Sequence, residues 1–395
     1  MKNIPPPAII LGAGGNGLGV ARSLGRRGIH TIVITDNIHS AESHSRFINE
    51  KIPFSGSDKD LVEMLLRNTA LHKDFPVVFP IRDATVSAIA ERLPELKKTY
   101  RIGMPDPETI KTALSKTSFD KMALDSGFPT AKTFSIKSYA QMEEVIEQIQ
   151  FPCILKPELR SNAFISAASA KAFLARTPSE LKNQYLSFAN ASPEVVVQEY
   201  IPGGEKDLYF CFQYYNRDSK PLVSISGRKI RQWPPRCGST SSCEVVSIPE
   251  IEFLSTHFFQ SIHYFGPCST EFKRDPRNGN FVFIEPTIGR TDWNNSFAEG
   301  NGIPIPFIAY CDITGLPVPL FRQKRLKYRW IRWSADYQAA SHAISQGDLS
   351  ISNWIKSIMP PIVGPVWSLD DPAPFFYTYF NRIKRKFLKL IKINK

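Results

Sequence analysis

An apolar strand, a glycine turn, a helix and a second apolar strand open this chain, and they constrain its fold more than any other feature. The turn is Gly12-Ala13-Gly14-Gly15-Asn16-Gly17, and the strand that follows the helix ends at Asp36. The expected elements are a strand at 8–11, a helix at 18–28, a strand at 31–35, a strand at 76–80 and a helix at 84–92. Strands that alternate with helices pack as a parallel sheet covered by helices. We therefore predict a parallel α/β domain over residues 1–106.

The same turn matches the dinucleotide-binding pattern, with glycines at 12, 14 and 17 and Asp36 beyond the next strand. Taken alone this pattern is weak, because many α/β domains use a glycine turn to bring backbone close to a ligand or to a neighbouring strand. We favour a Rossmann-like domain whose turn faces a substrate or is purely structural. A nicotinamide-dependent oxidoreductase is the alternative, and it leaves the second half of the chain unexplained.

The composition is that of a globular protein long enough for two or three domains. Hydrophobic residues make up 42% and charged residues 22% of the 395 positions. No apolar run approaches the roughly 18 residues of a membrane-spanning helix, and the glycine-rich N-terminus has no signal-peptide cleavage site. The six cysteines include no Cys-x-x-Cys pair, which argues against a zinc site or a disulfide framework. We expect a cytoplasmic protein.

The positive charge is concentrated at the C-terminal end. Of the net charge of +12, residues 321–395 contribute +10, from fourteen Lys or Arg and four Asp. The rest of the chain is nearly neutral, so no nucleic acid is expected as a partner. Residues 381–395 hold seven cations and no acid, with Ile383, Phe387, Leu390 and Ile391 at helical spacing. Such a helix suits an anionic membrane surface. We favour peripheral association with the inner membrane surface slightly over a helix docked on the body.

Two lysines stand where phosphate groups could be held. Lys116 precedes a predicted helix, and Lys156 ends the apolar strand Cys153-Ile154-Leu155-Lys156. A lysine at a strand end can place its ammonium on a phosphate while its stem packs. For either lysine taken alone, a side chain that only extends along the surface to solvent is the better explanation.

A strand that enters a glycine turn follows. Residues 195–199 read Val-Val-Val-Gln-Glu and continue as Tyr-Ile-Pro-Gly-Gly. The backbone of such a hinge offers N–H and C=O groups to the edge of an adenine ring. Glu205 and Asp207 come directly after it, where they could accept from ribose hydroxyls.

Two glutamates lie near the centres of two strands joined by a short turn at 275–279. Glu271 and Glu285 occupy alternating strand patterns, so both carboxylates can point to one face. Like charges side by side are unfavourable unless a cation such as Mg²⁺ bridges them. The alternative is an exposed pair on a wet sheet face.

A segment rich in cations, Pro and Gly spans residues 227–240. It contains Arg228 and Lys229, and we expect a lid whose cations meet an acyl phosphate or a substrate carboxylate. The alternative is a solvated basic loop. Two roles for Arg82 are weighted equally: it either anchors a substrate carboxylate or forms a surface ion pair with Asp83.

Taken together, these motifs resemble the ATP-grasp superfamily. The motifs in chain order are Lys116, Lys156, Gln198-Glu199-Tyr200-Ile201, Asp207, Glu271 and Glu285. The resemblance covers residues 107–316, and it implies two α+β subdomains that grip ATP. Residues 317–395 are then a C-terminal extension with a basic tail. The stretch 285–294, Glu-Pro-Thr-Ile-Gly-Arg-Thr-Asp-Trp-Asn, resembles the carboxylate–amine ligase branch, which includes enzymes similar to D-aspartate ligase and others associated with cell-envelope or polysaccharide biosynthesis.

The resemblance also implies roles for individual residues. Lys116 and Lys156 would hold the α- and β-phosphates, and Arg290 would stabilise the transferring phosphoryl group. The backbone at Glu199 and Ile201 would bind the adenine edge beside Gln198, and Asp207 or Glu205 would bind ribose. Glu271 and Glu285 would ligate Mg²⁺ or alternatively Mn²⁺. The family places an asparagine two residues after the second glutamate, where this chain has Thr287. A water, Asn294 or Asn295 would then replace that ligand. The usual glycines of the phosphate-covering loop are replaced by Ser161–Ser169.

The expected function is an ATP- and Mg²⁺-dependent ligase that activates a carboxylate as an acyl phosphate and transfers it to an amine. The carboxylate would be a small molecule or an envelope precursor, and a homodimer is left open. The alternative is a catalytically idle nucleotide-binding regulator or a membrane-tethered scaffold.

Overall fold

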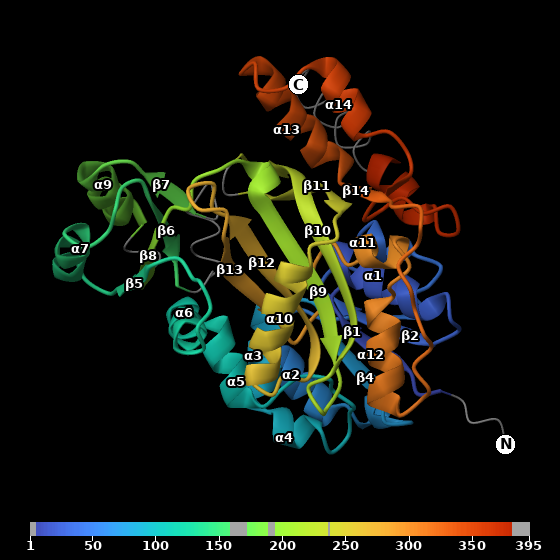
Figure 1. Cartoon of the computed structure of the whole chain (residues 1–395). Helices are drawn as coiled ribbons and strands as arrows, with labels where there is room; N and C mark the ends of the chain where they lie inside the picture. The colour runs from blue at the N-terminus through green and yellow to red at the C-terminus, as the bar shows by residue number, and fades with distance from the viewer. Residues whose placement is uncertain (1–4, 159–171, 189–193, 236–237, 381–395) are drawn as a thin grey trace, which may run out of the picture.

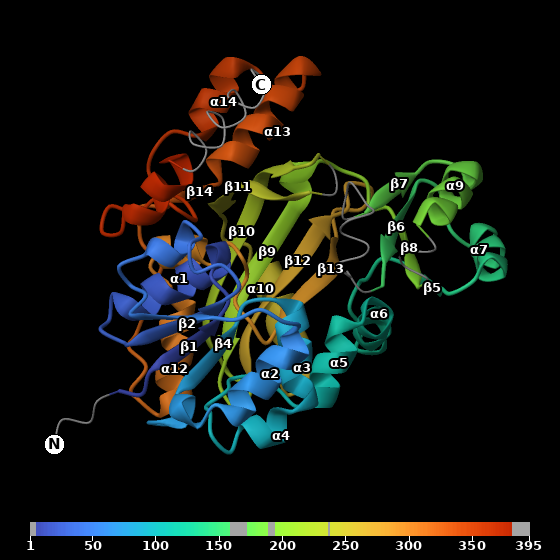
Figure 2. The same cartoon turned by 180° about the vertical axis from the view of Figure 1, so that it is seen from behind.

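The computed structural model describes residues 5–158, 172–188, 194–235 and 238–380. These residues form a four-stranded sheet near the N-terminus, a second four-stranded sheet and a seven-stranded sheet. Figures 1 and 2 show the second sheet and its helices projecting from a larger body that contains the other two.

The N-terminal sheet is parallel and has the strand order β3-β2-β1-β4. Its strands are β1 (Ala8–Leu11), β2 (Thr31–Thr35), β3 (Glu50–Pro53) and β4 (Val77–Pro80). Its helices are α1 (Gly14–Gly25), α2 (Asp58–Arg67), α3 (Asp83–Glu91) and α4 (Leu93–Leu96), with short 3₁₀ turns η1 (Glu42–His44) and η2 (Thr69–His72). The predicted parallel α/β arrangement is confirmed, and the strand order is that of half a Rossmann fold. The sequence analysis missed β3 and α2.

The second sheet is small, antiparallel and ordered β5-β8-β6-β7. Its strands are β5 (Thr133–Ile136), β6 (Cys153–Pro157), β7 (Phe173–Ala175) and β8 (Val195–Glu199). Helices α7 (Tyr139–Ile146) and α9 (Pro178–Phe188) cover it, and α5 (Pro107–Leu114) and α6 (Lys116–Asp125) lead into it. Its apolar core is separate from that of the rest of the molecule and includes Met142, Leu155, Leu181 and Val197.

The large sheet has the order β13-β12-β9-β10-β11-β14-β15. Its strands are β9 (Leu208–Tyr215), β10 (Pro221–Trp233), β11 (Ser239–Val245), β12 (Gly266–Arg274), β13 (Phe281–Ile288), β14 (Arg329–Ile331) and β15 (Ile362–Val363). All its pairings are antiparallel except that of β14 with β15. Helices α10 (Pro249–Ser261) and α12 (Ile305–Thr314) pack against it, and the short α11 (Ser296–Gly300) lies near β14.

The C-terminal segment is built into the body. Strands β14 and β15 extend the large sheet beyond the domain boundary that we predict at residue 316, and α13 (Trp333–Ser345) and α14 (Ile351–Ser357) lie at the same end as β11 (Figure 1). Asp371 then reaches back to α1, where its carboxylate accepts from Arg22 Nε at 2.8 Å in a buried ion pair. No helix in the described ranges is long and apolar enough to cross a membrane. The basic tail at 381–395 lies outside the described residues.

Candidate active site

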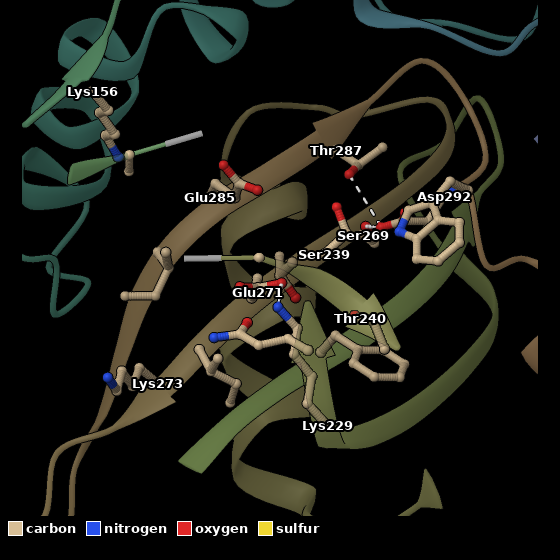
Figure 3. Close-up of a pocket in the computed structure, with 18 of the residues that line it drawn as sticks. Lys156, Lys229, Ser239, Thr240, Ser269, Glu271, Lys273, Glu285, Thr287 and Asp292 are labelled. Carbon is tan, nitrogen blue, oxygen red and sulfur yellow. Dashed lines mark hydrogen bonds and ion pairs between the residues drawn. The ribbon is translucent and has the colours of Figure 1, made fainter. Parts of the chain in front are cut away.

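A cavity of about 350 Å³ lies between the small sheet and the large sheet. Strands β6 and β8 provide lining residues on one side, and β9, β10, β11, β12 and β13 of the large sheet provide them on the other. Arg290, Asp292, Trp293 and Asn294, which follow β13, also line the cavity. Ten of the residues proposed from the sequence line it: Lys156, Gln198, Glu199, Ile201, Lys229, Glu271, Glu285, Thr287, Arg290 and Asn294. Figure 3 shows Lys156 opposite the strands that carry Glu271 and Glu285.

Glu271 and Glu285 are direct cross-strand partners in the pairing of β12 with β13. Both side chains line the cavity, so the prediction that they share one face is confirmed. Glu285 is exposed to the cavity, and among the described residues no hydrogen bond or ion pair holds its carboxylate. Two carboxylates therefore stand side by side on the cavity wall, and within the described ranges one cation forms an ion pair with them.

That cation is Lys229, whose Nζ lies 2.8 Å from Glu271 Oε2 with its side chain 5% exposed. The predicted lid over 227–240 is wrong for most of its length, because residues up to Trp233 belong to β10 and residues from Ser239 belong to β11. Arg228 points elsewhere: it pairs with Glu244 at 2.5 Å and does not line the cavity. The cations of this segment suggested a loop because their acidic partners are on other elements and cannot be recognised in the local sequence.

Lys156 is buried, and its ammonium donates to Gln198 Oε1 at 3.0 Å. The amide of Gln198 donates in turn to Thr133 Oγ1 at 2.9 Å and to Asp120 Oδ2 at 3.4 Å. Burial raises the pKa of Asp120 to about 6. Gln198, which we expected beside the adenine amine, therefore holds Lys156 in this structure. Its contact with adenine stays a prediction.

The hinge after β8 forms an apolar slot at one end of the cavity. Ile154, Ile201, Leu208 and Ile284 line this end, which suits the faces of an adenine ring. The N–H of Glu199 already donates to Lys132 O at 2.8 Å, so the carbonyl is the group that it offers to a ligand.

The two acids proposed for ribose lie on η3 (Glu205–Asp207) and are not among the residues that line the cavity. Asp207 accepts from the N–H of Gly204 at 2.7 Å, and Glu205 accepts from the N–H of Gln232 at 3.1 Å. Asp207 thus stabilises the turn itself, whereas Glu205 ties the turn to β10. Their contact with ribose stays a prediction.

Arg290 joins the cavity to the N-terminal domain. Its Nε lies 2.6 Å from Asp83 Oδ1, and although burial lowers the pKa of Arg290, the neighbouring Asp83 carboxylate raises it above its ordinary value. Asp83 also lines the cavity. Arg82 pairs with Asp58 at 2.9 Å rather than with Asp83, so that expected surface pair is absent here.

The glycine turn supports the loop after β13 that contributes lining residues to the cavity. A side chain at Gly17 would lie 2.1 Å from Gly12 O, so the turn needs glycine there for close packing. Asn16 donates to Thr291 O at 2.8 Å and accepts from Thr291 Oγ1 at 2.7 Å. The turn therefore positions residues 291–295, which supports the structural interpretation over a dinucleotide site.

Two of the elements proposed for phosphate binding lie wholly or partly outside the described residues. Lys116 is the first residue of α6, but its side chain lies outside the described part of the structure. The expected phosphate-covering loop at 161–169 is also outside the described residues. Their roles stay predictions.

Solved structures identify the arrangement. An ADP complex of PurK, an N5-carboxyaminoimidazole ribonucleotide synthetase, matches with a TM-score of 0.66 at 14% identity, over 83% of this chain and 82% of that one. The biotin carboxylase domain of 2-oxoglutarate carboxylase from Hydrogenobacter thermophilus, a dimer with MgADP, ADP and bicarbonate, matches with a TM-score of 0.64 at 16% identity, over 81% and 73%. N5-carboxyaminoimidazole synthetase from Staphylococcus aureus with ADP also gives 0.64 at 16% identity, over 82% and 81%. The chain has the ATP-grasp fold.

No family model matches the sequence, and neither does any curated protein. The ATP-grasp fold that the order of motifs predicted is nevertheless confirmed, because the similarity lies in the arrangement of the sheets.

The two acids of this cavity fit a magnesium ion whose remaining ligands come from phosphate oxygens and water. Mg²⁺ usually keeps several waters and is held by one or two carboxylates together with substrate phosphates. Glu271 and Glu285 provide such a pair. Within the described ranges no three His, Cys, Asp or Glu side chains gather closely enough to hold a metal by themselves, so phosphate oxygens would have to complete the coordination.

The hydroxyl and amide proposed as further metal ligands have protein partners. Thr287 donates to Asp292 Oδ2 at 3.4 Å, and Asn294 donates to Cys243 Sγ at 3.9 Å. Asp292 also lines the cavity, and the sequence analysis did not single it out. Its signal in the sequence was its place in the stretch 285–294, two residues after Arg290.

Proposed function

We propose that this chain is an ATP-dependent carboxylate–amine ligase that uses Mg²⁺ and forms an acyl-phosphate intermediate. The observation that carries the proposal is the pair Glu271 and Glu285, in register on one wall of a cavity whose opposite wall presents Lys156. The similar solved structures include a synthetase with ADP and a carboxylase domain with MgADP and bicarbonate, which supports a nucleotide in the cavity and a carboxylate beside it.

ATP would lie with its adenine in the apolar slot at Ile201 and its phosphates between Lys156 and the two glutamates. Glu271 and Glu285 would hold Mg²⁺, or alternatively Mn²⁺, and the bound ion would neutralise phosphate charge. Lys229 would leave Glu271 or share it as the phosphates arrive, because one carboxylate can accept from several partners.

The chain's own groups account for the rest of the chemistry. The substrate carboxylate attacks the γ-phosphorus in line, and Lys156 and Arg290 stabilise the charge on the transferring oxygens. The two sheets exclude water around the acyl phosphate, which would otherwise hydrolyse. An amine then displaces phosphate and forms the amide. The carboxylate is a small molecule or an envelope precursor in this proposal.

The test is a screen of acid–amine pairs for ADP release, followed by mass spectrometry of the product. We expect one class of pairs to release ADP only when both partners are present, and Lys156→Ala to lower this rate by at least about 100-fold. Lys137→Ala is the matched control, because Lys137 lies in the same subdomain with its side chain 62% exposed and pairs only with Glu194 among the described contacts. Undiminished turnover in Lys156→Ala would refute the assigned role.

An idle nucleotide-binding regulator or scaffold remains the rival proposal. It predicts MgADP binding by calorimetry without any substrate-dependent ATP consumption. The two acids and the lysine count against it, and measurable substrate-dependent ATP consumption would exclude it.

The basic tail supports a further proposal, that the protein is cytoplasmic and associates peripherally with an anionic membrane surface. Flotation with vesicles that contain anionic lipid should retain the full chain and lose a variant that ends at residue 380. Equal flotation of both would contradict this. A homodimer is also proposed, and light scattering of the purified chain would test it.

A further inference from the structure

Arg332 is a half-buried arginine without an acidic partner. Within the described ranges its guanidinium forms no hydrogen bond or ion pair, and its Nε is buried. Asp336, the acid four residues further on, is held by Arg231 instead, at 2.7 and 2.9 Å. The stretches outside the described residues contain no Asp or Glu. Burial lowers the pKa of the Arg332 guanidinium, and no carboxylate of the described residues raises it again.

The pairing of β14 with β11 fixes the position of Arg332. Its backbone N–H donates to Ser241 O at 2.8 Å, which continues the register that places Trp330 opposite Cys243. Cys243 is in turn opposite Lys229 on β10, and Lys229 lines the cavity. Because cross-strand partners share a face and side chains alternate along a strand, Arg332 lies on the cavity side of the sheet. Two interstrand spacings, about 10 Å, separate its strand from β10.

Trp293 connects Arg332 to the cavity. Trp293 is a lining residue, and the guanidinium carbon of Arg332 lies 4.9 Å from the centre of its ring. Ser239 and Thr240 of β11 also line the cavity. The hydroxyl of the next residue, Ser241, is buried and has no hydrogen-bond partner among the described residues. An unpartnered cation and an unpartnered hydroxyl therefore lie on neighbouring strands beside this part of the lining.

This arrangement suits an anionic ligand group. A cation that is partly removed from water without a partner is unfavourable. The guanidinium presents paired N–H donors in a plane, which match the oxygens of a carboxylate or a phosphate. Contact with the Trp293 ring orients that plane and leaves the N–H groups at its rim free to donate. Because Arg332 is only half-buried, a ligand group can reach it.

We infer that Arg332 binds an anionic group, a carboxylate or a phosphate, that one of the two substrates carries away from its reacting atoms. This inference rests on the proposed function. In that proposal the phosphates lie beside Glu271, which is in contact with Lys229, and the strand of Arg332 lies about 10 Å to the side of β10. An acid as small as bicarbonate cannot span that distance. The inference therefore distinguishes the substrate of this chain from the bicarbonate found with the similar carboxylase domain.

The experiment compares matched substrates in the ADP-release assay. Dicarboxylic acids are tested against their monoamides, and amines that carry a carboxylate or a phosphate are tested against the same amines without it. In wild type we expect the anionic member of one pair to have a KM about 10- to 100-fold lower, the usual contribution of hydrogen bonds to a charged group. The pair that responds identifies which substrate carries the group. In Arg332→Gln this preference should disappear, while kcat and the KM for ATP stay within about twofold of wild type.

Arg329→Gln is the matched control. Arg329 belongs to the same strand, is also half-buried and pairs with Glu244 at 3.8 Å, so its replacement should leave the preference unchanged. Arg332→Lys keeps the charge but loses the paired donors, and it should retain part of the preference. Calorimetry of MgADP binding, with the same affinity in Arg332→Gln as in wild type, would show that the variant is folded.

Several outcomes would overturn the inference. An equal rise in KM for both members of the pair in Arg332→Gln would make Arg332 a structural group. A preference that survives in this variant, or wild-type protein with the same KM for both members of every pair, would remove Arg332 from substrate binding. Wild-type protein that releases no ADP with any acid–amine pair would instead contradict the proposed ligase function.

Discussion

Replacing Asp120 by asparagine should change how nucleotide binding depends on pH. Asp120 is 5% exposed, and burial is the main reason that its pKa is raised to about 6. The Glu158 carboxylate raises the pKa further, whereas Thr133, Lys156 and Gln198 lower it. Those four groups face Asp120 from the elements packed around it, and Lys156 is the lysine that we assign to phosphate.

The size of the effect follows from the added phosphate charge. At an effective dielectric constant of 20, two unit charges about 10 Å apart interact by about 1.7 kcal/mol, or roughly one pKa unit. A nucleotide phosphate on Lys156 should therefore raise the pKa of Asp120 from about 6 to roughly 7. Because the bound state then holds the proton more tightly, wild-type affinity for MgADP should increase up to about tenfold, relative to the variant, as pH falls from 8 to 5.

Isothermal titration at pH 6.5 in two buffers of different ionisation enthalpy measures the proton uptake directly. We expect wild type to take up about half a proton more than Asp120→Asn on binding MgADP, with the protonation of the nucleotide itself cancelling between them. Equal uptake by the two proteins, or wild-type affinity that weakens relative to the variant as pH falls, would refute the reasoning.

The burial of Asp120 also makes the free energy of unfolding depend on pH. The folded pKa of about 6 lies above the unfolded value of about 3.9, so the folded state binds the proton more tightly between them. The ionised carboxylate therefore lowers the free energy of unfolding by about 3 kcal/mol above pH 6, and this loss disappears as pH falls to 4. Thermal melting of wild type should improve relative to Asp120→Asn over that range.

Three further predictions concern other contacts. Glu285→Gln should weaken MgADP binding while metal-free ADP binding stays within about twofold, because only one carboxylate is left for the ion; calorimetry with and without EDTA measures both. Lys229→Met should bind Mn²⁺ more tightly than wild type in the absence of nucleotide, measured by electron paramagnetic resonance, since the ammonium no longer competes for Glu271. Asp371→Ala should destabilise the docking of the C-terminal segment by about 3–5 kcal/mol, because Arg22 loses its buried partner; faster proteolysis around residues 365–371 would show it, and an unchanged rate would contradict it.

Local patterns in the sequence were sufficient for the features that depend on one or two neighbouring elements. The alternation of apolar and polar residues on both sides of a short turn placed Glu271 and Glu285 on one face, and the register confirms it. Likewise the strand, glycine turn and helix at the N-terminus predicted a parallel sheet. Side-chain alternation and turn chemistry are set by the backbone over a few residues, so they can be read without knowing the partners.

The tertiary structure alone decided which remote groups meet. The sequence analysis placed Lys229 in a lid because nothing near it in the chain shows that it has a partner. The structure shows that Glu271, on another strand of the sheet, is that partner. Asp292 acquired its place from Ser269, 23 residues away. The C-terminal segment, which looked like an extension, adds β14 and β15 to the large sheet and is held by Arg22, 349 residues from Asp371. Periodicity shows that a side chain needs a partner or a buried face, but the identity of that partner depends on how distant segments pack.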